Sequence, residues 1–112
     1  MHEIALALEI REICDRELVR AGGGRLREVG VDVGAFAGVE VETLRFCLDA
    51  VLGERFGGAR CEIRLEPARA ACLACAETFV VERTPFECPR CGGVARGASG
   101  GEGLRVSYLE LE

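Results

Sequence analysis

The 112-residue sequence contains no lysine, asparagine or glutamine, and it has a single histidine. Without lysine, the glycine-rich stretches at 22–24 and 92–103 cannot form a P-loop, whose lysine contacts the phosphates of a bound nucleotide. With one histidine, the chain offers no convincing pair of nucleophile and base. We therefore expect a protein that is not an enzyme.

The sequence also lacks a long hydrophobic run. No apolar stretch approaches the roughly 20 residues that span a bilayer, and the first residues lack the positive charges of a secretory signal. We therefore expect a cytoplasmic protein. In that reducing compartment, an odd total of seven cysteines fits metal binding together with buried thiols better than a set of disulfides.

The sequence also has no excess of positively charged residues. Fourteen basic residues, all arginine, face 19 acidic ones, for a formal net charge of −5. Four thiolates around one divalent ion would add about −2 more. Proteins that bind nucleic acid usually carry a basic stripe, so we expect no nucleic-acid partner.

Hydrophobic periodicity predicts two amphipathic helices and three main strands. The helices are expected at 4–21 and 39–55, with Glu40 and Glu42 at the start of the second, where carboxylates favour the positive end of the helix dipole. The strands are expected at 29–33, 61–65 and 104–111, and a change of alternation near Tyr108 predicts a bulge or a register break in the last one. A further short strand is expected at 78–82.

This order predicts an α+β fold, a small αβαββ domain in which two helices lie on a three-stranded sheet. The expected domain comprises residues 1–67 and 104–112. Between them, residues 68–103 form an inserted zinc-ribbon-like lobe with a glycine-rich linker.

Two C-x2-C pairs define the inserted lobe. Cys72 and Cys75 are separated by twelve residues from Cys88 and Cys91, a spacing typical of one tetrahedral metal ion held by four sulfurs. The alternatives are two disulfides, or a single iron held as in rubredoxin, which would indicate electron transfer. A zinc ribbon that binds nucleic acid or a transcription complex is a further alternative, which the negative charge disfavours.

The other three cysteines fall on the apolar faces of the predicted elements. We expect Cys14, Cys47 and Cys61 to be buried small hydrophobic residues, because no basic neighbour is visible that would lower the pKa values of their thiols.

The N-terminal residues Met1, His2 and Glu3 form a second candidate metal site. A bulky second residue normally prevents removal of the initiator methionine, so we expect the α-amine of Met1 to remain. This amine, the His2 amide nitrogen and the His2 imidazole can close adjacent chelate rings, a planar nitrogen set that suits Ni(II) or Cu(II). Glu3 could add an oxygen. The other interpretation is an incidental exposed histidine on a frayed terminus.

Several of these segments together resemble the HypA/HybF family of nickel metallochaperones. The resemblance covers the whole chain and rests on Met1-His2-Glu3, the segment Gly38 to Phe46, the cysteine quartet with Cys88-Pro89-x-Cys91-Gly92, and the closing Leu104 to Glu110. It implies that His2 binds nickel with Glu3 and terminal backbone nitrogens, Met1 included. It also implies that Cys72, Cys75, Cys88 and Cys91 hold a structural zinc.

The resemblance further implies a task and partners. The protein would deliver Ni(II), with the GTPase HypB, to the precursor of a [NiFe] hydrogenase large subunit, and in some organisms to urease through its accessory proteins. We expect a monomer or weak homodimer. Because His2 is the single histidine, a nickel site with a second imidazole from the same chain is excluded.

Overall fold

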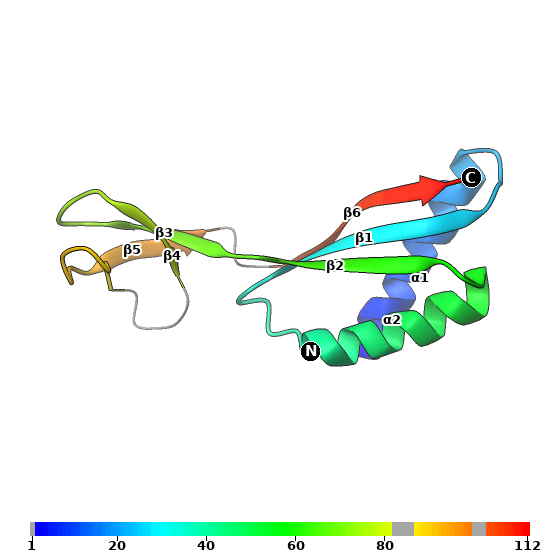
Figure 1. Ribbon diagram of the computed structural model, residues 1–112, viewed down its shortest axis with the longest axis horizontal. Coiled ribbons are helices and arrows are strands. Elements are labelled where there is room, and N and C mark those ends of the chain that lie inside the picture. Colours follow the sequence, from blue (N-terminus) through cyan, green and yellow to red (C-terminus); the bar gives the residue numbers. More distant parts are fainter. Residues whose placement is uncertain (1, 82–86, 100–102) are drawn as a thin grey trace.

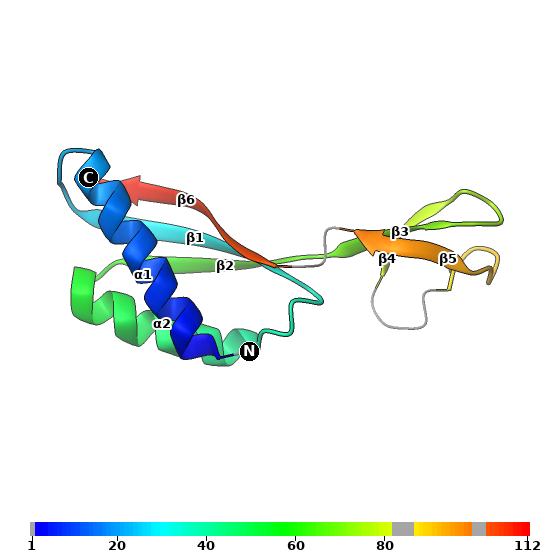
Figure 2. The same cartoon turned by 180° about the vertical axis from the view of Figure 1, so that it is seen from behind.

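The computed structural model describes residues 2–81, 87–99 and 103–112. The elements, in chain order, are α1 (Glu3–Arg20), β1 (Leu26–Gly34), α2 (Val41–Phe56), β2 (Arg60–Glu66), β3 (Ala68–Cys72), β4 (Thr78–Val81), β5 (Ala95–Ser99) and β6 (Leu104–Leu111). The molecule is elongated, 53 × 25 × 17 Å, with one sheet toward each end of its long axis (Figures 1 and 2). Both helices lie at the end formed by β1, β2 and β6.

Both predicted helices are confirmed, with small differences at their ends. The second begins at Val41 instead of position 39 because Glu40 is its N-cap: Glu40 has extended backbone angles, and its carboxylate accepts a hydrogen bond from the Glu42 amide at 3.0 Å. The expected role of these two glutamates at a helix start is therefore confirmed. In the described part of the chain, neither helix is long and apolar enough to cross a membrane.

The first sheet has the strand order β2-β1-β6, and the two helices cover one of its faces (Figure 1). β1 is parallel to β2, to which α2 connects it, and antiparallel to β6. This αβαββ arrangement is the predicted α+β fold.

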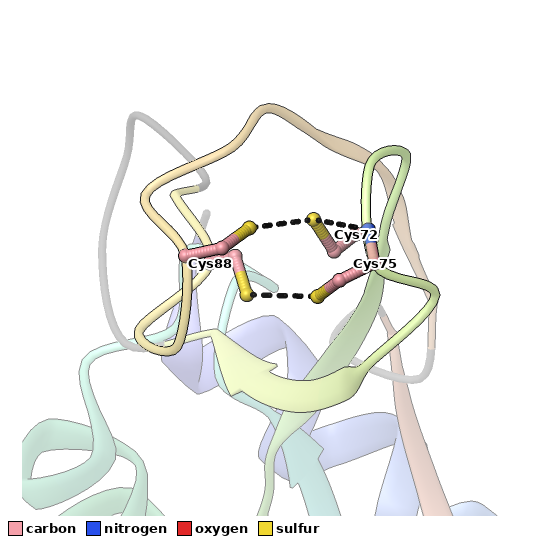
Figure 3. A group of neighbouring side chains, drawn as sticks. Cys72, Cys75 and Cys88 are labelled. Atoms are coloured by element: carbon pink, nitrogen blue, oxygen red, sulfur yellow. Dashed lines mark hydrogen bonds between the residues drawn. The ribbon is translucent and has the colours of Figure 1, made fainter.

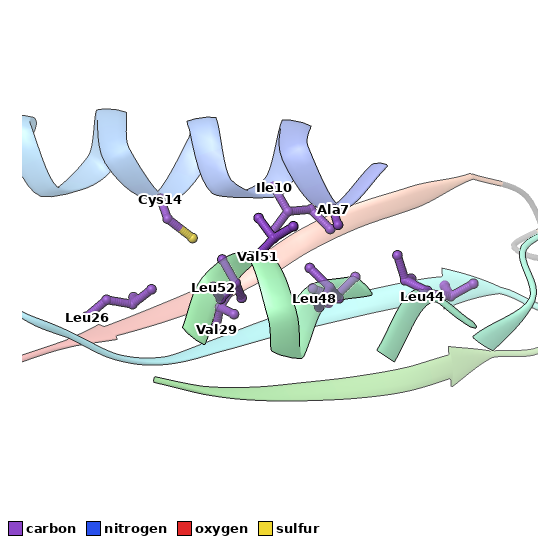
Figure 4. Close-up of a cluster of buried hydrophobic side chains, with 11 residues drawn as sticks. Ala7, Ile10, Cys14, Leu26, Val29, Leu44, Leu48, Val51 and Leu52 are labelled. Atoms are coloured by element: carbon purple, nitrogen blue, oxygen red, sulfur yellow. The ribbon is translucent and has the colours of Figure 1, made fainter. Parts of the chain in front are cut away.

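The core of the first sheet lies between β1 and the helices (Figure 4). Most of its buried residues lie on the predicted apolar faces: Ile10 and Cys14 from α1, Leu44, Leu48, Val51 and Leu52 from α2, and Val29, Val31 and Val33 from β1. Ala7 and Leu26 are also buried, although the periodicity did not single them out. Burying one leucine side chain contributes about 1.5–3 kcal/mol. Hydrophobic burial therefore holds this half of the molecule together.

The predicted bulge in the last strand is confirmed. Tyr108 of β6 lies opposite Gly30, and Val106 lies opposite Val31, so Ser107 is an extra residue in the ladder. The Tyr108 ring packs against the bare backbone of Gly30: a Cβ there would lie 2.0 Å from its Cε1 atom. The phenol hydroxyl also contacts the carboxylate of Glu28.

The second sheet has the order β4-β3-β5, with both pairs antiparallel. The strand expected at 78–82 is observed as Thr78–Val81; Glu82 lies outside the described residues. Two strands were not predicted: β3, where no element was expected, and β5, which occupies part of the stretch expected to be a glycine-rich linker. Among the residues that the structure describes, the buried cluster of this second sheet consists of Ala68, Ala70 and Val81.

Candidate metal centres

The four cysteines of the quartet come together at the end of the second sheet. Cys72 ends β3 and Cys75 follows on the next turn, while Cys88 and Cys91 lie on a second turn before β5. All four sulfurs lie within 4.8 Å of one another. The Sγ atoms of Cys72 and Cys91 are 3.5 Å apart, and those of Cys75 and Cys88 are 3.8 Å apart (Figure 3).

These separations fit a tetrahedral metal ion. Four sulfurs at about 2.3 Å from zinc would lie about 3.8 Å from one another. The backbone of each turn supports a thiolate, since the amide of Cys75 donates to Cys72 Sγ at 3.5 Å and that of Gly93 donates to Cys91 Sγ at 3.4 Å. The first of these bonds is the main cause that lowers the pKa of Cys72 to about 7. The donor set is therefore compatible with a zinc site.

Glycine is favoured at two positions beside the quartet. A Cβ on Gly93 would lie 3.2 Å from the sulfurs of both Cys72 and Cys91. The preceding Gly92 has a φ of 74°, in the left-handed region that favours glycine. The Cys-Gly-Gly sequence thus lets the chain turn tightly around the sulfurs.

The N-terminal candidate site lies at the other sheet, at the start of α1. His2 is exposed and is the N-cap residue, with φ −89° and ψ 103°. Its carbonyl accepts hydrogen bonds from the amides of Ala5 and Leu6 at 3.1 and 3.2 Å. Met1 lies outside the described residues.

Glu3 joins the N-terminus to the start of the second helix. Its Oε2 atom accepts a hydrogen bond from the backbone amide of Glu40 at 3.0 Å. This bond is the main cause that lowers the pKa of the Glu3 carboxyl. Sequence reasoning missed this contact because it joins residues 37 positions apart. The acidic residues at the start of α2 indicated the beginning of a helix but not its contact with Glu3. The structure thus holds Glu3 at a fixed place beside Glu40.

The two candidate sites are not brought together. Among the described residues, the cysteine quartet is the one group of three or more histidine, cysteine or acidic side chains whose ligand atoms converge. His2 and Glu3 belong to the half of the molecule that carries the helices (Figure 2). The two centres are therefore separate.

The remaining cysteines lie in or beside the core of the first sheet. Cys14 is fully buried, and Cys47 and Cys61 are half-buried. Burial raises the pKa values of the Cys14 and Cys61 thiols to about 11. Both are therefore neutral thiols at pH 7, in agreement with the prediction of small hydrophobic residues.

Solved structures of similar shape share this fold. The solution structure of the Ni metallochaperone HypA from Helicobacter pylori matches with a TM-score of 0.67 and 18% identity, over 99% of this chain and 97% of that one. A second solution structure of a HypA protein also matches with a TM-score of 0.67, at 17% identity. At these identities the likeness concerns the fold alone.

Similarity in sequence extends over the full length. The HypA family model, described as hydrogenase/urease nickel incorporation, metallochaperone, matches residues 1–111. A hydrogenase maturation factor HypA from Azotobacter vinelandii is 38% identical, and one from Rhodopseudomonas palustris (strain BisA53) is 37% identical, each over the whole of both chains. The chain therefore belongs to the HypA family of nickel metallochaperones for hydrogenase maturation.

Proposed function

We propose that this protein carries Ni(II) at its N-terminus and releases it to the maturation machinery of [NiFe] hydrogenase. The nickel ligands are the α-amine and backbone of Met1, the amide and imidazole of His2, and Glu3. The observation that carries this proposal is the position of His2: exposed, in extended backbone, immediately before a helix whose first residue is tied to α2.

The contact between Glu3 and Glu40 supports this assignment. It occupies one carboxylate oxygen and fixes the backbone beside His2, so the ligands are partly pre-arranged before nickel binds. A planar set of nitrogens from a terminus suits Ni(II). Since the site is at an exposed chain end, a partner can approach it and displace its ligands one at a time.

We further propose that the quartet of Cys72, Cys75, Cys88 and Cys91 holds a structural zinc that is not transferred. When bound, zinc would offset about half of the negative charge of the four thiolates and link the two turns. A site closed by four sulfurs has no open position for chemistry or exchange. The protein is thus a carrier and not an enzyme, with a labile metal at one site and a permanent one at the other.

Transfer would proceed by ligand exchange in the cytoplasm. The proposed partners are the GTPase HypB and the precursor of the hydrogenase large subunit, with urease and its accessory proteins as recipients in organisms that contain them. The net charge of −5 is consistent with protein partners and not with nucleic acid.

A nickel titration by calorimetry tests the assigned ligands. We expect the chain with its native terminus to bind one nickel tightly, and both His2→Ala and a form extended at the N-terminus to lose that binding. Zinc content should stay at about one per chain in all three. Glu12→Ala, an exposed change on the same helix, is the control that should bind nickel like the native protein.

A further variant separates the two roles of Glu3. Glu3→Gln removes the charge but keeps an oxygen that can accept the Glu40 amide, so it should fold normally and bind nickel less tightly. Unchanged nickel affinity in both His2→Ala and the extended form would reject the site. Nickel bound at the cysteines in place of zinc would reject the division of roles.

A further inference from the structure

β6 presents an unpaired edge. In the described part of the chain, the first sheet ends at this strand, which is eight residues long. An edge of this length can template pairing with a further strand. Beside it lies a groove of about 550 Å³, lined by Ile13, Glu17 and Arg20 of α1, by Ala21 at the end of that helix, and by residues of β6 that include Val106, Leu109 and Leu111.

The bulge at Ser107 arranges the side chains of β6 in an unusual way. On the helix side, opposite core residues of β1, lie Leu104, Val106, Leu109 and Leu111. On the other side, opposite Asp32, Gly30 and Glu28, lie Arg105, Tyr108 and Glu110. Arg105 and Glu110 are five positions apart, so a regular strand would put them on opposite faces. The extra residue puts them on the same face.

We propose that β6 pairs, antiparallel, with β6 of a second copy of this chain. In the register that sets Ser107 opposite Tyr108 of the copy, each Arg105 lies opposite a Glu110. Leu104 then lies opposite Leu111, and Val106 opposite Leu109. A bulge can protect an edge from pairing. In this register, however, the bulges of the two strands lie beside each other, so every pair of opposed residues points to the same side of the sheet.

The charges of the single chain favour this partner. Glu110 lies directly opposite Glu28 of β1, and like charges in that position are unfavourable. Glu110 forms no ion pair within the described residues. Arg105 contacts Asp32 through one nitrogen, Nη2, and a guanidinium has five N–H donors. Arg60 of β2 forms an ion pair with Glu28 and attracts Glu110 only from beyond ion-pair distance. An Arg105 from the second copy would therefore give Glu110 a direct partner of opposite charge.

The groove provides the apolar part of the interface. Leu104 and Val106 of the copy, opposite Leu111 and Leu109, would enter the groove under α1 near Ile13. The result is a six-stranded sheet with helices on one face. Because the two β6 strands run in opposite directions, the two cysteine lobes extend from opposite ends, and both N-terminal sites stay accessible.

Sedimentation of the full-length zinc-loaded protein tests the interface. We expect the native chain to associate with increasing concentration into a species of twice the 12.0 kDa of one chain. Glu110→Arg should weaken this association about tenfold or more, because two pairs of opposite charges become two pairs of like charges. Glu62→Arg, the same change on the opposite edge strand β2, should leave it unchanged.

A mixture supplies the most specific result. Arg105→Glu should also weaken self-association, yet Glu110→Arg mixed with Arg105→Glu should form a heterodimer, since each cross-strand pair is again one of opposite charges. Independently of any variant, hydrogen exchange of the β6 amides should slow with concentration, while that of the β2 amides should not.

Three outcomes would overturn the proposal. One is a native chain that stays monomeric up to roughly 0.5 mM, a concentration at which even weak pairs associate. Another is loss of the dimer in Glu62→Arg but not in Glu110→Arg. The third is a mixture of the two charge variants that fails to associate.

Discussion

Asp32 is the buried charged residue of the described chain, and its position explains how the outer face of the first sheet is held. It lies on the central strand, where Oδ1 accepts from Arg64 of β2 and Oδ2 from Arg105 of β6, both at 3.2 Å. One carboxylate thus bridges all three strands on the face that the helices do not cover. The hydrogen bond from Arg64 is the main cause that lowers the pKa of Asp32 below its ordinary value.

Replacement of the Asp32 carboxylate should reduce the loss of folding stability at acidic pH. A group whose pKa is lower in the folded state stabilises above its unfolded pKa, about 3.9 for aspartate, and this contribution is lost as the pH falls through the folded value. Asp32→Asn should therefore unfold at lower urea than the native protein at pH 7, and the difference should shrink below about pH 4.

The exposed Asp49→Asn on α2 is the matched control. It should show no such difference between the two pH values. A constant gap between Asp32→Asn and the native protein from pH 7 to pH 3 would contradict the linkage.

Among the elements, β1 and β6 pack closely at one glycine, Gly30 of β1. The Tyr108 ring occupies the place where a side chain of residue 30 would stand. Gly30→Ala should therefore destabilise the fold by about 1–3 kcal/mol, because the ring or the strand has to shift.

Gly53→Ala should change the folding stability in the opposite direction. Gly53 lies within α2, and a Cβ there meets nothing within 4 Å, so alanine should stabilise the helix by about 0.5–1 kcal/mol. Chemical denaturation of both variants measures the change in the free energy of unfolding that each substitution causes. Equal effects of the two changes would mean that the packing of Tyr108 on Gly30 contributes nothing.

The elements also show what the sequence could predict and what it could not. α1, α2, β1, β2 and β6 follow from hydrophobic periodicity, because a single face of each meets one core. β3 and β5 consist mainly of alanine, arginine and glycine, which carry no strand signal. They pair as strands because the two cysteine turns at the end of the lobe hold these segments next to one another. The contact of Glu3 with Glu40 depends on tertiary packing and has no local signature.

At the scale of the whole molecule, the two sheets differ in what stabilises them. Within the described residues, the first sheet has a core of eleven buried residues, whereas the second has three, which are two alanines and one valine. A cluster of that size is too small to support a fold without a staple. We therefore expect the second sheet, but not the first, to depend on its metal.

Removal of the metal by a strong chelator tests this difference. Hydrogen exchange should become fast in β3, β4 and β5, while amides of β1 and α2 keep their protection. Re-addition of zinc should restore the slow exchange. Simultaneous loss of protection in both sheets would mean that they fold as one cooperative unit.

The junction between β2 and β3 has a mechanical consequence. A single residue, Pro67, separates the two strands, and the chain runs extended through both sheets (Figure 1). Proline has a fixed φ, the residue before it is restricted to extended angles, and the Glu66 carbonyl is also held by the Ala35 amide at 2.9 Å. Residues 60–72 thus act as a stiff rod of roughly 40 Å. Such a rod transmits torque but resists shortening, so rotation of the cysteine lobe would twist the first sheet and leave the distance between the two ends almost constant.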